Sequence, residues 1–128
     1  MFIRHNPSTI AAPLGTYCHG TEVPPNARWL YTAGQVAIDT NGVCPENFEA
    51  QAELVYRNII AILESAGMGL ENLVKITAYI VGQENFKTYA EVRKHVLGDV
   101  RPASTAIVVP ALVKPEWLIE VEAVAAKV

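Results

Sequence analysis

Two carboxylates that could hold a water molecule stand two residues apart near the end of the chain, in the segment WLIEVEAVAA. Because side chains alternate between the two faces of a β-strand, Glu120 and Glu122 are expected to share one face with Leu118 and Val124. This face is either wetted by solvent or lines a cavity in which a carboxylate can act as a general base. The spacing alone leaves both interpretations open.

The other residue types that often perform chemistry are scattered along the chain. His5, His19 and His95 fall in separate segments without a shared spacing, which predicts no metal site. Cys18 and Cys44 lack CxxC spacing, and two reduced thiols are the simplest interpretation. The chain also contains no GxSxG elbow and no glycine spacing typical of a phosphate-binding loop.

Three further positions are candidates because of where they stand. Gly34 interrupts an apolar segment, which indicates either a bulge or a close approach to the backbone. Tyr17 offers a phenolic hydroxyl near the N-terminus, and Arg101 begins the segment RPAST, which leads from a loop into a strand. An arginine in such a loop is most often solvated, so its position alone predicts no function.

The rest of the sequence supplies the elements that must position these residues. Residues 48–67 carry apolar side chains at three- and four-residue steps, and residues 85–98 repeat this helical pattern. Strands are predicted over six ranges: 1–5, 15–23, 27–38, 72–81, 104–112 and 116–126. Two helices can cover only one face of the resulting sheet, so the second face needs a partner. A symmetric oligomer is therefore expected on physical grounds.

Composition and charge narrow the functional classes. The 128 residues, of which 51% are hydrophobic and 18% charged, fit one compact domain spanning residues 1–128. The net charge of −3 and the lack of a lysine/arginine cluster argue against a nucleic-acid partner. No apolar run has the length of a membrane span, and the first residues lack the apolar core of a signal peptide. We therefore expect no membrane partner and a cytoplasmic location.

Four stretches, taken together in their order and spacing, resemble the RidA family, also called YjgF-type proteins. They are APLGTYCHG, LYTAGQVAID with the turn TNG, AQAELVYRNIIAILESAGMGLENLVKITAYIV, and RPAST followed by IEVEAVA. The resemblance covers essentially the whole chain. It implies an α+β fold similar to that of chorismate mutase, with a six-stranded, mostly antiparallel, mixed sheet and two helices on one face. It also implies a homotrimer with a cleft at each subunit interface.

The resemblance further implies an activity and a set of site residues. Members of the best-known branch hydrolyse reactive imines and enamines, mainly 2-imino acids, to a keto acid and ammonia without a cofactor. In that branch an arginine binds the substrate carboxylate and a glutamate on the last strand positions water. Carried over to this chain, the catalytic residue is Glu120, whereas Glu122 falls outside the pocket. The implied substrate-binding positions are Tyr17, Ala33, Gly34, Ser104, Thr105 and Ala106.

The chain departs from the family pattern at four of its polar positions. Ser104 stands where the arginine is expected, Ala106 where a cysteine is expected, and Ala33 where a serine is expected. Ala90 stands where better-known members have an asparagine. Loss of a charge-assisted bidentate contact removes about 1.5–3 kcal/mol, which lowers turnover of 2-imino acids by roughly one to several orders of magnitude. Arg101, three residues before Ser104, is the candidate for compensation.

Three functions follow from these observations, in decreasing order of preference. The first is a cofactor-free hydrolytic deaminase, an enzyme acting on a small imine or enamine whose recognition does not depend on an arginine at position 104. The second is a trimer that binds a small metabolite without catalysis, which the less polar pocket favours. The third is the ribonuclease or translation inhibitor named for some relatives, which the acidic balance of the chain disfavours.

Overall fold

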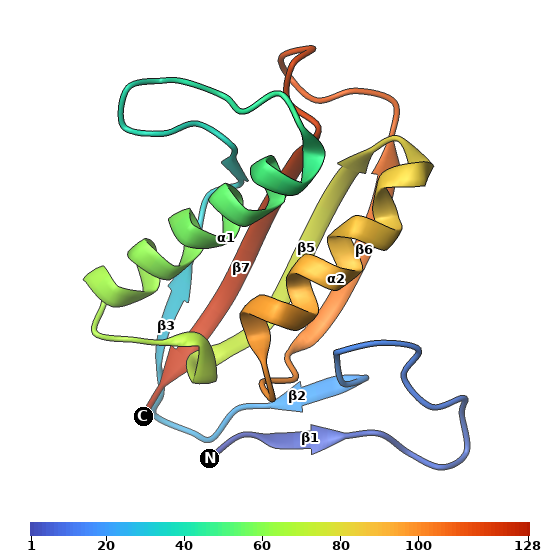
Figure 1. Ribbon diagram of the computed structural model, residues 1–128. Coiled ribbons are helices and arrows are strands. Elements are labelled where there is room, and N and C mark those ends of the chain that lie inside the picture. The colour runs from blue at the N-terminus through green and yellow to red at the C-terminus, as the bar shows by residue number, and fades with distance from the viewer.

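The computed structural model describes residues 1–128 as two layers, a twisted sheet and a pair of helices packed on it (Figure 1). The helices are α1 (Phe48–Ser65) and α2 (Phe86–Leu97), with short 3₁₀ helices η1 (Leu70–Asn72) and η2 (Gln83–Asn85). The strands are β1 (Ile3–His5), β2 (Gly20–Glu22), β3 (Arg28–Tyr31), β4 (Gln35–Val36), β5 (Leu73–Val81), β6 (Ala103–Val109) and β7 (Ile119–Lys127). The α+β class and both predicted helices are confirmed.

The main sheet has five strands, in the order β3-β7-β5-β6, with β4 also pairing with β7. Only β5 and β6 run parallel, and the other pairs are antiparallel. β1 and β2 form a separate antiparallel ribbon, which Figure 1 shows beside the start of β6. An isolated bridge between Cys18 and Ala103 joins the ribbon segment to the main sheet. The strands thus divide into five and two, where the sequence suggested one sheet of six.

The helix α1 begins and packs as its sequence predicts. Asn47 is the N-cap, and its side chain accepts a hydrogen bond of 2.7 Å from the backbone N–H of Ala50. Residues of one stripe are fully or almost fully buried against the sheet, namely Ala52, Val55, Tyr56, Ile59 and Leu63. The chain turns away at Gly67, whose φ of +68° is a conformation that glycine adopts without strain.

The sheet has one covered face and one bare face. Along β5, Ile76, Ala78 and Ile80 are completely buried beneath the helices, while the alternate side chains remain only half-buried on the far side. The bare face exposes Trp29 and Tyr31 at its β3 edge and Ile107 on β6. The predicted one-sided cover is confirmed. None of the helices combines the length and the hydropathy needed to cross a membrane.

Candidate functional site

A cavity of about 310 Å³ opens where the loop before β2, the helix α2 and the edge strand β6 meet. Its volume lies at the lower end of the range found for small-molecule pockets. Five of its eight lining residues are hydrophobic, and one is a cation; the lining consists of Leu14, Gly15, Tyr17, Phe86, Ala90, Arg93, Ser104 and Ala106. The structure thus brings three of the predicted substrate-binding residues, Tyr17, Ser104 and Ala106, to one place.

The cation is Arg93 of α2, which the sequence analysis did not select. Only 4% of its surface is exposed. Its Nε donates to the Thr16 hydroxyl at 3.2 Å, and its Nη1 donates to the Ser104 hydroxyl at 3.3 Å. The guanidinium also lies 5.9 Å from the ring centre of Tyr17 and 5.4 Å from that of Tyr89, within the range of cation–π attraction. Arg93 is therefore held from several sides beside the cavity.

The loop over this guanidinium is tied down by its own hydrogen bonds. The Tyr17 hydroxyl accepts the backbone N–H of Leu14 at 3.1 Å, and the Tyr17 N–H donates to the carbonyl of Gly15 at 3.0 Å. A Cβ at Gly15 would lie only 3.0 Å from Nη2 of Arg93, so glycine here permits the close approach. Tyr17 therefore both shapes the loop and forms part of the cavity wall.

A pair of buried tyrosines supports Arg93 from the core side. The hydroxyls of Tyr56 on α1 and Tyr89 on α2 are hydrogen-bonded at 2.9 Å. Burial raises the pKa of Tyr56 well above its ordinary value. Burial also raises the pKa of Tyr89, although the hydrogen bond with Tyr56 and both the positive charge and the hydrogen bonding of Arg93 act in the opposite direction. Both phenols are therefore neutral partners at physiological pH.

Glu120 belongs to a second group of residues on the bare face of the sheet. Its half-buried side chain lies against Gly34, where an added Cβ would overlap the carboxylate and would stand 2.8 Å from Cδ. The close approach predicted for Gly34 is thus present, and the group that approaches is Glu120. Glu122 instead accepts a 2.9 Å hydrogen bond from the Tyr79 hydroxyl, and this bond raises the pKa of Tyr79. Of the two carboxylates, Glu120 is the one without a hydrogen-bond donor in its own chain.

The two groups lie on opposite faces of the sheet within one chain. Ser104 pairs with Ile76, which is completely buried beneath the helices. Glu120 pairs with Tyr79, and Tyr79 pairs with Ile107, on the other face. Directly opposed residues of neighbouring strands point to the same side of a sheet. The predicted site residues are therefore gathered as two half-sites, one with Ser104 and one with Glu120.

The remaining predicted residues lie outside the cavity. Thr105 follows Ser104 onto the bare face and accepts a 2.6 Å hydrogen bond from the Lys75 ammonium. Ala33 precedes Gly34, and its carbonyl accepts a hydrogen bond from the side chain of Gln35 at 3.3 Å. The Arg101 guanidinium donates to two backbone carbonyls at the end of α2, those of Gly98 at 2.6 Å and Val100 at 3.0 Å. The structure does not bring Arg101 to Ser104.

The sequence did contain a signal for Arg93. It lies four residues after Tyr89 and four before Leu97, both of which are buried, so it falls on the apolar stripe of α2. A charged residue on a buried stripe is rare unless it has partners or a function. Periodicity alone identified the apolar members of the stripe and passed over its charged member.

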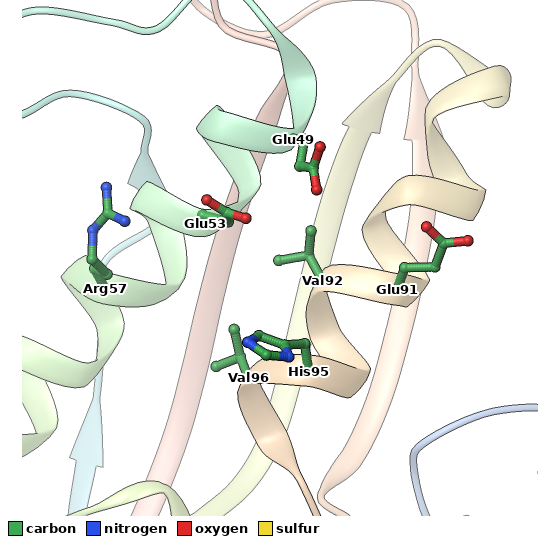
Figure 2. Close-up of a pocket in the computed structure, with 7 residues that line it drawn as sticks. All are labelled: Glu49, Glu53, Arg57, Glu91, Val92, His95 and Val96. Atoms are coloured by element: carbon green, nitrogen blue, oxygen red, sulfur yellow. The ribbon is translucent and has the colours of Figure 1, made fainter.

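A larger hollow, of about 510 Å³, lies between the outer surfaces of α1 and α2. Figure 2 shows its mostly polar lining: Glu49, Glu53 and Arg57 project from α1, and Glu91, Val92, His95 and Val96 project from α2. It contains none of the residues that the sequence singled out. No group of three or more histidine, cysteine, aspartate or glutamate side chains in the chain could hold a metal ion. We interpret this groove as a solvated charged surface.

Comparison with known proteins agrees with the fold described above. The family described as endoribonuclease L-PSP matches residues 8–127 of the chain. The chain belongs to this family, which includes the RidA and YjgF proteins. The resemblance stated from the sequence is thereby confirmed.

Individual members of the family are similar over nearly the whole chain. A RutC family protein of Pyrococcus abyssi is 36% identical over 117 residues, which cover 90% of this chain and 89% of that protein. The 2-iminobutanoate/2-iminopropanoate deaminase of Mus musculus is 32% identical over 127 residues, covering 96% of this chain and 91% of that protein. A Rid family protein from Yersinia pestis has a crystal structure that superposes with a TM-score of 0.88 at 30% identity, covering 98% of each chain.

Proposed function

We propose that this RidA family member is a cofactor-free hydrolase that deaminates small imines or enamines, acting as a cytoplasmic homotrimer. The observation that carries the proposal is the Glu120 carboxylate, which lies in the space left by Gly34 and accepts no hydrogen bond from its own chain. Such a carboxylate is available to hold and deprotonate water. The activity named for the mouse relative supports the reaction type. The two free thiols agree with a reducing compartment.

The reaction needs one water molecule and one base. Glu120 accepts a proton from water while the oxygen adds to the carbon of the C=N bond, and the imine nitrogen takes up a proton. The resulting tetrahedral amino alcohol then loses ammonia as its hydroxyl becomes the carbonyl. Overall, one imine and one water molecule give one carbonyl compound and one ammonia molecule. An enamine enters the same sequence after protonation of its carbon converts it to the imine. Glu120 acts as the proton carrier in both directions.

A second copy of the chain is needed to bring the two half-sites together. Glu120 lies on the bare face, whereas Tyr17, Ser104 and Ala106 line the cavity on the covered side of the β6 edge. The bare face also exposes large apolar side chains, with Tyr31 71% accessible. Burial of this face against other copies would remove that apolar surface from water and could carry Glu120 to the mouth of a neighbour's cavity.

The test is hydrolysis of freshly generated 2-iminobutanoate and 2-iminopropanoate, followed as release of the 2-oxo acid. Glu120→Gln keeps the size of the side chain but removes the base, and general acid–base catalysis typically contributes about 10²–10⁴-fold. We therefore expect at least a 100-fold loss of activity. Glu122→Gln is the matched control, because Glu122 shares the strand and the face but already has Tyr79 as its partner.

Retained activity in Glu120→Gln would contradict the assignment of the base. Equal losses in both variants would indicate a general effect on the sheet instead of a catalytic carboxylate. Analytical ultracentrifugation of the native chain provides the separate test of the trimer.

A non-catalytic metabolite-binding protein is the second candidate, favoured by Ala90 and Ala106 in the cavity and by Ala33 beside Gly34. Ligand binding without turnover, unchanged in Glu120→Gln, would support it over the enzyme. Ribonuclease activity, which the description of the family suggests, would require RNA binding that is detectable at low salt.

A further inference from the structure

We propose that Arg93 is the anion-binding group of the cavity and that it receives the carboxylate of a small 2-imino or 2-oxo acid. The charge would thus come from the helix α2 and not from position 104 of β6, where the family pattern places it. The identity of the substrate in this inference rests on the proposed function. The choice of Arg93 rests on the geometry of the chain.

Arg93 is a buried cation without a counter-ion. It is 96% buried, and the one ion pair in the chain joins His5 and Glu22, far along the sequence from α2. No aspartate or glutamate lines the cavity beside it. Removing a guanidinium from water is unfavourable unless an anion or several hydrogen bonds compensate. Two long hydrogen bonds to hydroxyls, at 3.2 and 3.3 Å, compensate only in part.

The orientation of the guanidinium leaves part of its edge available. Nε donates to Thr16 and Nη1 to Ser104, and the Tyr89 hydroxyl is a further polar neighbour of the guanidinium. Nη2 makes no well-formed hydrogen bond within the chain and is not fully shielded from solvent. Each terminal nitrogen carries two N–H groups, so one hydrogen bond from Nη1 to Ser104 leaves a second N–H on that nitrogen. The free N–H groups of Nη1 and Nη2 form the fork that binds carboxylates with two parallel hydrogen bonds.

The Arg93 side chain is held by neighbours on several sides, which preorganises it for binding. The rings of Tyr17 and Tyr89 lie within cation–π range of the guanidinium, and Gly15 provides the space for Nη2. Because the Arg93 side chain is already held in place, it loses little additional conformational entropy when a ligand binds.

The walls of the cavity define the rest of the ligand. The side chains of Leu14, Phe86, Ala90 and Ala106 are apolar, and the volume is about 310 Å³. This space suits a carboxylate with a short aliphatic chain. A neighbouring hollow shares Arg93 with the cavity and adds two lysines and one glutamate, Lys87, Lys94 and Glu91. Its excess of positive charge favours the approach of anions.

The same contacts account for the serine at position 104. The Ser104 hydroxyl accepts a hydrogen bond from Nη1 of Arg93, whereas an arginine at this position would place a second guanidinium beside the first. Arg101, the compensating residue suggested by the sequence, is occupied by two backbone carbonyls and does not line the cavity.

The test compares two unreactive probes of nearly equal shape, 2-oxobutanoate and its neutral amide 2-oxobutanamide. Calorimetric titration of the native chain should show that the carboxylate binds at least tenfold more tightly than the amide. Arg93→Met should remove this preference while binding of the amide changes little. Arg101→Met is the matched control and should keep the preference, because Arg101 lies outside the cavity.

Equal binding of the two probes by the native protein, or an unchanged preference in Arg93→Met, would overturn the proposal. If Arg93→Met does not fold, the comparison of 2-oxobutanoate with 2-oxobutanamide on the native protein still shows whether the cavity prefers an anionic ligand. Arg93→Lys, which keeps the charge but not the fork, then tests the residue and should reduce the preference. Hydrolysis is measured separately. A protein that prefers the carboxylate probe but does not hydrolyse imines would refute the deaminase function alone. A protein that hydrolyses imines but does not prefer the carboxylate probe would refute the Arg93 site alone.

Discussion

The contact between Gly34 and Glu120 makes Gly34→Ala the sharpest test of the proposed catalytic half-site. The only change is one methyl group, yet the new Cβ would overlap the Glu120 carboxylate and would lie 2.8 Å from its Cδ. Carbon atoms in ordinary contact are about 3.5–4.0 Å apart, so the carboxyl group must move by about 1 Å. The backbone at Gly34 has no left-handed φ, so the effect comes from space and not from conformation.

The consequences for activity and for stability should differ. A displacement of about 1 Å in a catalytic group can reduce the rate by about 100-fold, equivalent to about 2.7 kcal/mol in the activation barrier. The Glu120 side chain is only half-buried and can turn toward solvent, so the free energy of unfolding should fall by less than about 1 kcal/mol. We therefore expect a low kcat in a protein of nearly native stability.

The assay is steady-state hydrolysis of 2-iminobutanoate, with chemical denaturation and calorimetric binding of 2-oxobutanoate on the same preparation. Gly20→Ala is the control, because a Cβ there would meet nothing closer than 3.8 Å from the His5 side chain. Near-native kcat in Gly34→Ala would refute the reasoning, since the carboxylate would then have moved without effect. A loss of 2-oxobutanoate binding would also contradict it, because Arg93 belongs to the other half-site.

Three further predictions concern the framework around the site. Ser104→Arg should lower the free energy of unfolding by about 1–2 kcal/mol through repulsion from Arg93, and denaturation should show a much smaller loss in an Arg93→Ala background. Because burial raises the pKa of Tyr56 and Tyr89, the unfolded chain loses these protons first, so these two phenols should leave stability unchanged well below pH 10 and should make it decline above about pH 10. Tyr56→Phe should flatten this alkaline decline in urea titrations at successive pH values. Asn47→Ala should lower the free energy of unfolding by about 1 kcal/mol through loss of the α1 cap, without changing ligand binding.

Much of the fold could be predicted because its elements repeat simple patterns. The alternation of β5 places Ile76, Ala78 and Ile80 on one face, and the number of helices requires that the other face stay bare. The number of strands was harder to predict. Short segments before α1 pair in two different sheets, and their partners lie far away in sequence.

The site was harder to predict because it depends on register between strands. Alternation within β7 correctly puts Glu120 and Glu122 on one face, but it cannot say which face of β6 carries Ser104. That relation is set by the pairing of both strands with β5. Arg93 was not predicted for a related reason. Its proximity to Ser104 arises only from the tertiary structure, and the sequence shows only that Arg93 lies on the apolar stripe of α2.

The two half-sites should respond differently to dissociation of the oligomer. All groups that hold Arg93, namely Thr16, Tyr17, Tyr89 and Ser104, come from the same chain, so the proposed carboxylate site needs no residue of a second subunit. Hydrolysis, in the assembly proposed above, also needs Glu120 from a second copy. Dilution below the dissociation constant should therefore abolish the specific activity while 2-oxobutanoate still binds. Parallel loss of both properties on dilution would mean that the Arg93 cavity is itself shaped by the neighbouring chain.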